Sequence, residues 1–424
     1  MEESKIYKLG EVCTKIGSGA TPKGGKEAYL GGDTSLIRSQ NVLDFSFSWD
    51  GLAYINDEQA SRLNGVELER NDVLLNITGD SVARACIVPD EALPARVNQH
   101  VAIIRGDQSI VLNDYILYYL QFKKQYLLSL SQGGATRNAL TKGMIEELEI
   151  PLPALNKQKG IVSILKSLDD KIELNRRIND NLEQQAQALF KSWFVDFEPF
   201  KDQPFVESEL GMIPQGWRVY SMDELVEVIG GYSYKGSELQ DSNIAMATIK
   251  NFNRNGGFKI DGFKEIIPSP KAKPDQYLAK YDILIAHTDL TQNADIIGNP
   301  ALLLNFGDYE RIIMSMDLVK VNSKVESITY GLLYSFFADS RFKSHALGYV
   351  NGTTVLHLSK KSIPEYKIAL PCDLTIVNQY GLILNSLFEK ESFIIDESRR
   401  LAELRDTLLP RLMSGELKVN DVDA

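Results

Sequence analysis

The chain of 424 residues is poor in cysteine, contains no long apolar run and has no excess of positive charge. Its three cysteines, Cys13, Cys86 and Cys372, are odd in number and far apart, which fits reduced thiols in a cytoplasm better than a disulfide framework. No apolar stretch approaches the ~18 residues that a membrane span needs, and the first residues lack the pattern of a signal peptide. We therefore expect a cytoplasmic protein with no membrane partner.

The charge balance is acidic, with a net charge of −11 from 46 Lys and Arg against 57 Asp and Glu. This balance predicts no general attraction to phosphate, so a nucleic-acid role would have to rest on local basic surface or on a partner protein. The contents of 44% apolar and 24% charged residues are ordinary for globular protein. The length allows two or three hydrophobic cores.

Catalytic and metal-binding motifs are also missing. The segment Asn299-Pro300-Ala301-Leu302 comes nearest to the Asn/Asp-Pro-Pro-Tyr/Phe motif of an amino methyltransferase, but it lacks the second proline and the aromatic residue. Residues 19–26 fail as a phosphate-binding loop, because Glu27 stands where a hydroxyl residue is needed. Neither Pro-Asp pair, at 89–90 or 274–275, is followed within the next thirty residues by the Asp/Glu-x-Lys element of a nuclease. The four histidines lie far apart without cysteine pairs, so we predict no metal site and no catalysis.

What the sequence does contain is a long internal repeat. Leu9-Gly10-Glu11-Val12 returns as Met222-Asp223-Glu224-Leu225, and the segment 70–75 returns as 280–285. Residues between 134 and 153 match residues between 352 and 371 at a constant offset of 218, from residue 134 to residue 352. A period this long indicates a duplicated domain with its connector rather than a solenoid, whose units run to ~20 to 50 residues. Two similar modules suit a target with two similar halves.

Each repeat divides into a mixed segment and a long helix. Short β-like runs separated by turn signals cover 34–42, 73–78, 83–88 and 97–104, and a helix is predicted over 113–130. Three prolines interrupt the segment 198–217, which marks a domain boundary. We therefore divide the chain into 1–153 (first module), 154–198 (central long helix), 199–371 (connector and second module) and 372–424 (C-terminal long helix).

The two long helical segments carry the heptad pattern of a coiled coil, with seam positions at alternating steps of four and three. In the first segment these positions are Ile161, Leu165, Leu168, Ile172, Asn175, Asn179, Leu182, Ala186, Leu189 and Trp193. In the second they are Ile376, Tyr380, Ile383, Leu387, Lys390, Ile394, Glu397, Leu401, Leu404 and Leu408, before Pro410 and Gly415 end the helix. The alternative is an ordinary amphipathic helix. The seam positions, however, extend over residues 161–193 and 376–408, and each segment is longer than the usual helix of ~10 to 14 residues. Some forty residues would form a rod of ~60 Å.

Five segments in series resemble one known family, the specificity subunits of type I restriction-modification systems, over essentially the whole length. They are Leu9-Gly10-Glu11-Val12, Ile150-Pro151-Leu152-Pro153, Lys191-Ser192-Trp193-Phe194-Val195-Asp196-Phe197, the connector from Leu210 to Trp217, and the segment from Leu404 to Leu417. Each segment is common alone and specific in combination.

The resemblance implies an α+β fold of two similar target-recognition domains joined by two long antiparallel helices, in a pseudo-twofold arrangement. Each domain would read one half of an interrupted double-stranded DNA sequence. The family binds two modification (methyltransferase) subunits and, in the full enzyme, two restriction and translocation subunits. The specificity subunit itself does no chemistry, so S-adenosylmethionine, Mg²⁺ and ATP are expected only on partner subunits.

Polar loops at matching places in both modules are the predicted DNA contacts. Arg and Lys can pair with guanine, Asn and Gln with adenine, and Ser and Thr hydroxyls with phosphate. The candidates in the first module are Arg38, Gln40, Asn41, Thr78, Ser81, Arg84, Thr136, Arg137 and Asn138. Those in the second are Lys250, Asn251, His287, Thr288, Gln292, Asn293, Thr353, Thr354 and His357. The alternative for any single residue is that Asn, Thr and Gly simply form turns.

Two further hypotheses follow from the charge and the repeat. Because the chain is acidic, we expect it to bind DNA weakly alone, with the modification subunits completing the electrostatic contacts. The competing functional class is a scaffold whose two modules bind protein, with the helices as a ruler. Duplication, long helices and negative charge fit that class equally well.

Overall fold

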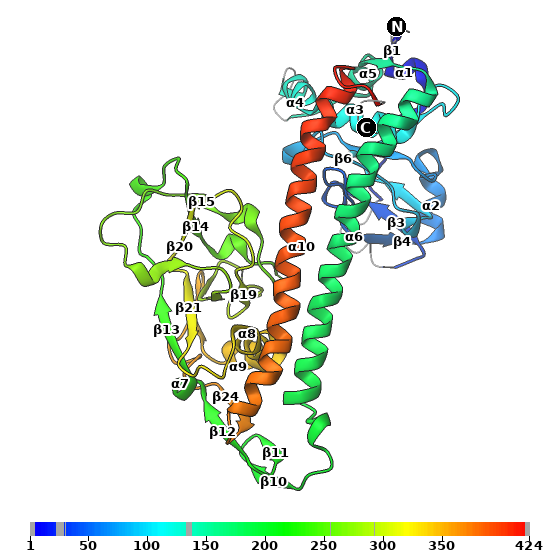
Figure 1. Cartoon of the computed structure of the whole chain (residues 1–424). Helices are drawn as coiled ribbons and strands as arrows, with labels where there is room; N and C mark the ends of the chain where they lie inside the picture. Colours follow the sequence, from blue (N-terminus) through cyan, green and yellow to red (C-terminus); the bar gives the residue numbers. More distant parts are fainter. Residues whose placement is uncertain are drawn as a thin grey trace. The chain divides into compact units, whose positions relative to one another are not determined.

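The computed structural model describes residues 5–22, 29, 31–132, 138–254, 256–291 and 293–419. It divides into two compact units, unit 1 with Met1–Ile172 and Arg400–Ala424, and unit 2 with Glu173–Arg399. The division falls inside two long helices, α6 (Leu155–Phe194) and α10 (Thr375–Met413), so each unit contains a part of both (Figure 1).

Unit 1 is built on a four-stranded antiparallel sheet. Its strands, in spatial order, are β2 (Cys13–Ser18), β8 (Val101–Gly106), β5 (Val73–Asn76) and β6 (Ala85–Ile87). Alternate residues of the central strand β5 belong to different cores, because Val73 and Leu75 pack on one face and Leu74 on the other. This two-sided burial explains why the strand reads as a continuous apolar run rather than an alternating one.

The two faces of this sheet are covered by different elements. A smaller sheet of β4 (Ala53–Ile55), β3 (Thr34–Ile37) and β7 (Ala95–Val97), with β3 parallel to β7, contributes to one core. The helices α3 (Asn113–Phe122) and α4 (Lys124–Gln132) contribute to the other. The single helix predicted over 113–130 is therefore wrong. α3 is buried on nearly all sides whereas α4 buries only Leu127 and Ser131, and the chain bends at Lys123 where the burial changes.

Unit 2 repeats this order of strands, which confirms the internal repeat. Its main sheet runs β13 (Val226–Gly230), β21 (Leu318–Ser323), β17 (Ile283–Ala286) and β19 (Pro300–Leu302). Its second sheet runs β15 (Lys264–Glu265), β14 (Ile244–Ala247), β20 (Arg311–Met314) and β16 (Tyr277–Leu278), with β14 parallel to β20. The helices α8 (Tyr330–Ala338) and α9 (Ser340–Leu347) take the places of α3 and α4.

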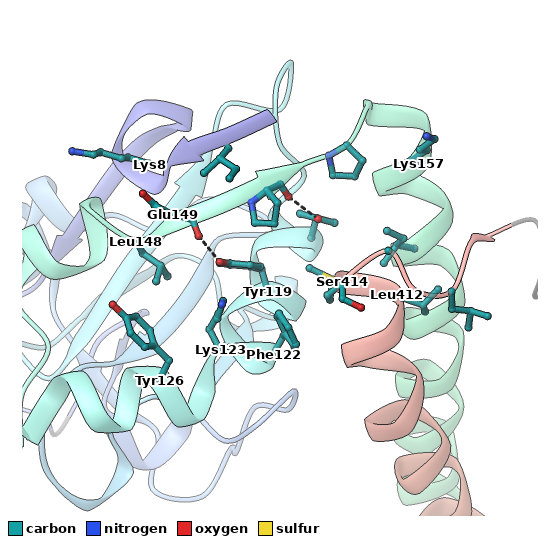
Figure 2. A pocket seen from close by; sticks show the side chains of 18 of the residues that line it. Lys8, Tyr119, Phe122, Lys123, Tyr126, Leu148, Glu149, Lys157, Leu412 and Ser414 are labelled. Atoms are coloured by element: carbon teal, nitrogen blue, oxygen red, sulfur yellow. Dashed lines mark hydrogen bonds between the residues drawn. The ribbon is translucent and has the colours of Figure 1, made fainter. Parts of the chain in front are cut away.

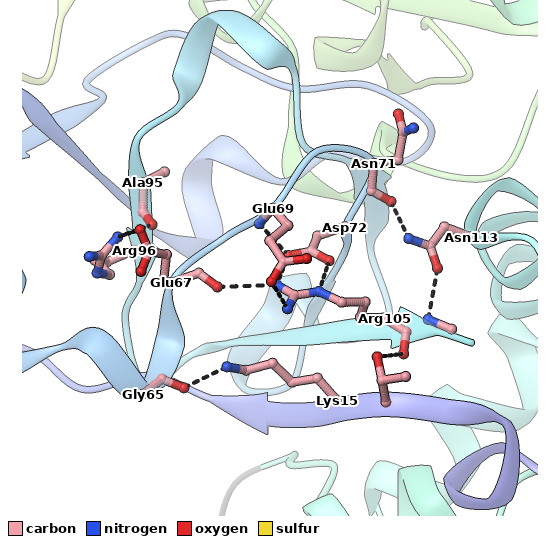
Figure 3. Close-up of polar contacts among 12 residues, drawn as sticks. Lys15, Gly65, Glu67, Glu69, Asn71, Asp72, Ala95, Arg96, Arg105 and Asn113 are labelled. Carbon is pink, nitrogen blue, oxygen red and sulfur yellow. Dashed lines mark hydrogen bonds and ion pairs between the residues drawn. The ribbon is translucent and has the colours of Figure 1, made fainter. Parts of the chain in front are cut away.

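The repeat extends to single residues at the start of the central strand. Asn71 and Tyr281 both have a positive φ, of 62° and 71°, and each is followed by an aspartate. Asp72 accepts a hydrogen bond from the Glu69 amide and pairs with Arg105 (Figure 3). Asp282 likewise accepts from the Ala279 amide and pairs with Lys320. The same strained turn and the same carboxylate therefore precede both central strands, although their cationic partners differ.

Short elements complete the two units. In unit 1, β1 (Lys5–Lys8) pairs with β9 (Glu149–Leu152), and α1 (Leu9–Val12), α2 (Asp57–Arg62) and α5 (Lys142–Glu146) are single turns or little more. In unit 2, β12 (Trp217–Ser221) pairs with β24 (Lys367–Pro371), and α7 (Met222–Leu225) follows β12. The predicted connector forms the hairpin of β10 (Phe205–Ser208) and β11 (Gly211–Pro214). A small sheet joins β18 (Thr288–Asp289), β23 (Leu356–Leu358) and β22 (Val350–Asn351).

The long helices pack antiparallel within each unit, as the sequence predicted. In unit 1, Arg405 of α10 pairs with Asp169 of α6 at 2.8 Å. In unit 2, Asn175 of α6 donates to Glu397 at 2.7 Å, and the Trp193 and Tyr380 rings lie 4.5 Å apart. The contacting residues of α6 run from 169 up to 193 while their partners in α10 run from 405 down to 380, which shows antiparallel packing.

The predicted seam is correct for α6 and correct in part for α10, where six of the ten predicted positions are buried or half-buried. All ten predicted positions of α6 are buried or half-buried. In α10, Ile376, Ile383 and Leu404 are 43%, 46% and 47% exposed, and the buried stripe lies one residue later, at positions such as Val377 and Leu384. The shift arises because α10 packs on its own domain as well as on α6, since Val377, Leu384 and Phe388 belong to the main core of unit 2. A one-residue shift turns a helix by ~100°.

Pro410 also does not end the helix, contrary to the prediction. It lies inside α10, which continues to Met413. A proline removes one backbone hydrogen bond and crowds the preceding turn. Here Leu409, Leu412 and Met413 are buried in the core of unit 1, and that burial offsets the cost.

We predict that Asp169→Ala strongly destabilises the protein. Asp169 accepts hydrogen bonds from Arg405 at 2.8 Å and from the Tyr118 hydroxyl at 2.7 Å, so its removal leaves the buried Arg405 guanidinium with only the exposed Asp406 as a carboxylate partner. The expected loss in the free energy of unfolding is about 3 kcal/mol or more. Urea denaturation of the full chain measures it. The neighbouring, exposed Asp170→Ala is the control and should stay within about 0.5 kcal/mol of the parent; equal losses would contradict the assignment.

Candidate nucleic-acid interface

Polar loops converge at one end of the main sheet of unit 1. This end is where β2 and β5 finish and where β6 and β8 begin. Backbone hydrogen bonds connect the loops there, from the Gly79 amide to the Asn138 carbonyl at 3.1 Å and from the Ile77 amide to the His100 carbonyl at 3.0 Å. The Gly19 amide donates to the Asn98 carbonyl at 3.1 Å. Segments distant in sequence are thus held as one surface.

The turn Ser39–Asn41, which follows Arg38, lies beside the same sheet end. The buried Asn76, the last residue of β5, donates its side-chain amide to the Ser39 carbonyl at 2.9 Å. The Asn98 amide donates to the Ile37 carbonyl at 3.1 Å. The predicted contacts around residues 38–41, 78–84 and 138 are therefore brought together.

Unit 2 builds the equivalent surface from the equivalent loops. The His287 amide donates to the Asp317 carbonyl at 2.8 Å, and the Leu358 amide donates to the His287 carbonyl at 2.9 Å. The turn Ile249–Asn251 adjoins this sheet end, because the Ser315 amide donates to the Ala247 carbonyl at 2.9 Å. The candidates near 250, 287 and 357 are brought together in the same way.

Three candidates are buried, which argues against direct DNA contact. Asn41 and Asn251 are both 0% exposed, and their side-chain oxygens accept from the Arg38 amide at 3.1 Å and the Thr248 amide at 2.9 Å. The turn-forming alternative is correct for both. The buried Thr288 donates its hydroxyl to Asp317 at 3.0 Å. These residues shape the loops rather than present donors at the surface.

The other described candidates reach the surface to different extents. Arg38, Thr78, Ser81, Arg84 and His287 are half-buried. The exposed candidates are Gln40, Asn138, Lys250, Asn293, Thr353, Thr354 and His357. The predicted contacts Thr136, Arg137 and Gln292 lie outside the described residues.

A hydrogen-bonded pair at the sheet end was missed by the sequence reasoning. The Thr78 hydroxyl and His100 Nδ1 lie 2.6 Å apart, and Gln99, which is exposed, contacts His100 Nε2 at 3.2 Å. The equivalent pair in unit 2 joins Thr288 to Asp317. The sequence could have indicated this pair, because His100 and Asp317 directly precede the equivalent strands β8 and β21.

Charge at these surfaces is local and modest. Arg84 forms no ion pair within the described part of the chain, and Lys250 is exposed beside the matching sheet end of unit 2. Burial, together with the nearby His357 and Lys360, lowers the pKa of His287. His287 is therefore neutral at pH 7 and offers either a donor or an acceptor.

Comparison with known proteins identifies the family of this two-unit fold. The family model described as the type I restriction modification DNA specificity domain matches residues 1–184. The type I restriction enzyme MjaIX specificity subunit of Methanocaldococcus jannaschii is 27% identical, with 99% of this chain and 94% of that protein covered. The chain is thus similar to type I restriction-modification DNA specificity subunits over nearly its whole length.

Further relatives cover nearly the whole length of the chain. The HindI specificity subunit of Haemophilus influenzae is 24% identical over 98% of this chain and 100% of that protein. The crystal structure of a type I restriction-modification S subunit from M. genitalium shares the fold, with a TM-score of 0.53 and 14% identity over 96% of this chain and 95% of that one. The predicted mixed fold of two similar domains with long helices is thereby confirmed.

A groove of about 1610 Å³ lies elsewhere in unit 1 (Figure 2). Tyr119, Lys123 and Tyr126 line it from the α3–α4 side, with the Tyr119 hydroxyl donating to the Glu149 carbonyl. Leu412 and Ser414 line it from the end of α10. The groove is mainly apolar with lysines around it, unlike the polar sheet end.

The described residues contain neither a candidate metal site nor a helix that could cross a membrane. They contain no group of three or more His, Cys, Asp or Glu side chains placed to hold a metal ion. Among the helices that the structure describes, none has the length and apolar character required to cross a bilayer.

We predict that Asp289→Ala loosens the loop that carries Asn293. The buried Asp289 accepts hydrogen bonds from the amides of Thr291 at 2.7 Å, Ile296 at 2.6 Å and Ile297 at 3.1 Å. Burial raises its pKa, but these amides outweigh burial and the net pKa is lowered. Without the carboxylate, amide hydrogen exchange in the loop should accelerate and the chain should lose about 1 to 3 kcal/mol.

Hydrogen exchange with mass spectrometry measures this loosening. The control is Asp295→Ala in the same loop, whose carboxylate lies 3.8 Å from the exposed Arg254 and should contribute little. If amide hydrogen exchange in the loop is equally fast in Asp289→Ala and in Asp295→Ala, Asp289 does not organise the loop.

Proposed function

We propose that this specificity subunit reads a bipartite sequence in double-stranded DNA, with one half contacted by the sheet-end loops of each unit. The observation that carries the proposal is the recurrence of one loop surface at the same sheet end in both units. Polar side chains on hydrogen-bonded loops suit base-edge recognition, because the loops hold each donor or acceptor in a fixed position against the base.

The two halves of the target differ in sequence under this proposal. Gln40 and Lys250 occupy equivalent turns, yet a glutamine amide suits adenine N6 and N7 whereas a lysine ammonium suits guanine O6 and N7. His100 and Asp317 are equivalent positions with opposite acid-base character. A shared scaffold with different side chains supports two different half-sites.

The long helices set the separation of the two halves in this proposal. α6 and α10 contain 40 and 39 residues, which corresponds to ~60 Å of helix each. Successive turns of a DNA duplex are ~34 to 36 Å apart, so helices of this length suit half-sites separated by a few base pairs or by a turn.

The subunit has no catalytic role in this proposal and takes its chemistry from partners. Two modification subunits, and two restriction and translocation subunits in the full enzyme, would supply the sites for S-adenosylmethionine, Mg²⁺ and ATP. Exposed apolar residues on α10 support docking of a protein there, since Leu382 and Phe393 are 56% and 66% exposed. Eleven residues separate them, so they share one face of the helix. The modification subunits would also add the positive charge that a chain of net charge −11 lacks.

Exchange of the first module tests the function. Replacing residues 1–153 with the matching module of a divergent relative should change one half of the methylated target and leave the other half unchanged. The reason is that each sheet end is built within its own unit. Methylome sequencing of a host that expresses the subunit with its modification partner measures both halves at once. Loss of both halves, or no change in either, would favour the scaffold alternative.

We predict that Phe393→Ser weakens assembly with the modification subunit at least tenfold. The substitution removes exposed apolar area from α10 without disturbing either core, and a central aromatic contact is worth about 2 kcal/mol or more at an interface. Analytical ultracentrifugation of the two purified subunits measures assembly. Ile267→Ser, which removes a residue of similar exposure away from the helices, is the control. Unchanged assembly in Phe393→Ser would show that this face is not the docking surface.

A further inference from the structure

Unit 2 contains a cavity of about 500 Å³ that the DNA-reading function does not use. It lies among α6, α8, α10 and the loop around residues 256–261. Its walls are largely apolar, with Leu302, Leu304, Phe388 and Ile395 among the lining residues. Such walls suit an aliphatic body rather than a hydrated ion.

Three carboxylates line this cavity: the exposed Asp261, and two half-buried glutamates on the long helices. Glu183 comes from α6 and Glu391 from α10, and neither forms an ion pair within the described residues. The one hydrogen bond of Glu183 comes from the Gln187 amide at 3.4 Å. Lys259 lies at the cavity but is exposed and pairs with neither carboxylate. Two acids on facing helices with no counter-ion are costly, unless something else neutralises them.

A third polar group, independent of the acids, lines the same cavity. Tyr334 of α8 is only 6% exposed, and its hydroxyl makes no hydrogen bond in the part of the chain that the structure describes. Its ring is fixed by an edge contact with Phe388, with centroids 5.3 Å apart. The hydroxyl oxygen itself is accessible from the cavity, and it is therefore available to a group bound beside the two glutamates.

The electrostatics agree with this geometry. Burial, and then the charges of Glu183 and Asp180, raise the pKa of Glu391 to about 8. Burial and Asp180 also raise the pKa of Glu183. Burial, and then the charges of Glu183 and Glu391, raise the pKa of Tyr334. A bound cation would relieve all three.

We propose that this cavity binds a primary alkylammonium group, with Glu183 and Glu391 as the anionic contacts and the Tyr334 hydroxyl as a third acceptor. An ammonium has three donors, which can meet the two glutamates and the Tyr334 hydroxyl, and its alkyl chain matches the apolar walls. The two sources of such a group are a free polyamine and a lysine side chain of a partner protein. Occupancy of the cavity in unit 2 would then depend on the polyamine concentration or on the presence of that partner protein, and not on DNA.

Calorimetric titration of the full chain with spermidine at pH 8 and 0.15 M NaCl tests the proposal. One saturable site is expected. Glu391→Gln should weaken it at least about tenfold, because a charge-assisted contact is lost, and Tyr334→Phe should weaken it less. The control is Glu389→Gln, which makes the same charge change on the same helix, where Glu389 is exposed and accepts from Tyr330. It should leave the affinity unchanged within about twofold.

Two comparisons complete the test. N-acetyl-lysine methylamide in place of spermidine distinguishes the sources, since comparable binding identifies a lysine side chain as an acceptable ligand and spermidine binding alone identifies a polyamine. Glu391→Gln preserves shape and removes a buried charge, so thermal unfolding should show a folded protein. The absence of saturable binding, or equal weakening by Glu389→Gln and Glu391→Gln, overturns the proposal.

Discussion

Burial of both faces of the central strands is the constraint on which the rest of the structure depends. In β5 and β17, neighbouring side chains enter different cores, so neither face of the main sheet is open to a ligand. Contact of a large ligand with the main sheet is therefore confined to its ends, where loops leave the strands. One end carries the polar loops, and the repeat places the same surface in both units. The fold thus dictates where recognition occurs, while the loop side chains determine what is recognised.

Polar groups inside the helix contacts act on register more than on stability. Asp169 with Arg405 in unit 1, and Asn175 with Glu397 in unit 2, form their hydrogen bonds only when the helices are aligned as observed. A slip by one turn would bury an arginine or an asparagine without its partner, whereas an all-leucine contact would tolerate the slip. Fixed register matters in a protein whose helices are proposed to measure a distance along DNA.

The sequence predicted the repeat, the long helices and the polar loops, because these depend on local patterns and on comparison of the chain with itself. It did not predict which face of α10 is buried, since an apolar pattern cannot distinguish contact with α6 from contact with the domain core. Asn41 and Asn251 were misjudged for a related reason: an asparagine that caps a turn and one that reads a base look identical in sequence. The facing pair Glu183 and Glu391 was invisible, because 208 positions separate residue 183 from residue 391 and only the fold brings them to one cavity.

The distribution of acid explains how a chain of net charge −11 can serve DNA. Part of the negative charge is turned inward, with Asp72 and Asp282 paired to cations beside the central strands and Asp289 held by backbone amides. Another part faces the cavity between the helices of unit 2. At the sheet ends, Arg84 and Lys250 are left without an ion pair within the described residues, and they can meet phosphates or base edges. Net charge is thus a poor guide to the interface, because long-range repulsion is screened at physiological salt within ~8 Å and local groups decide the contact. Partner subunits with positive surface would then raise affinity without altering which bases are read, since phosphate contacts position a protein whereas base contacts specify the sequence.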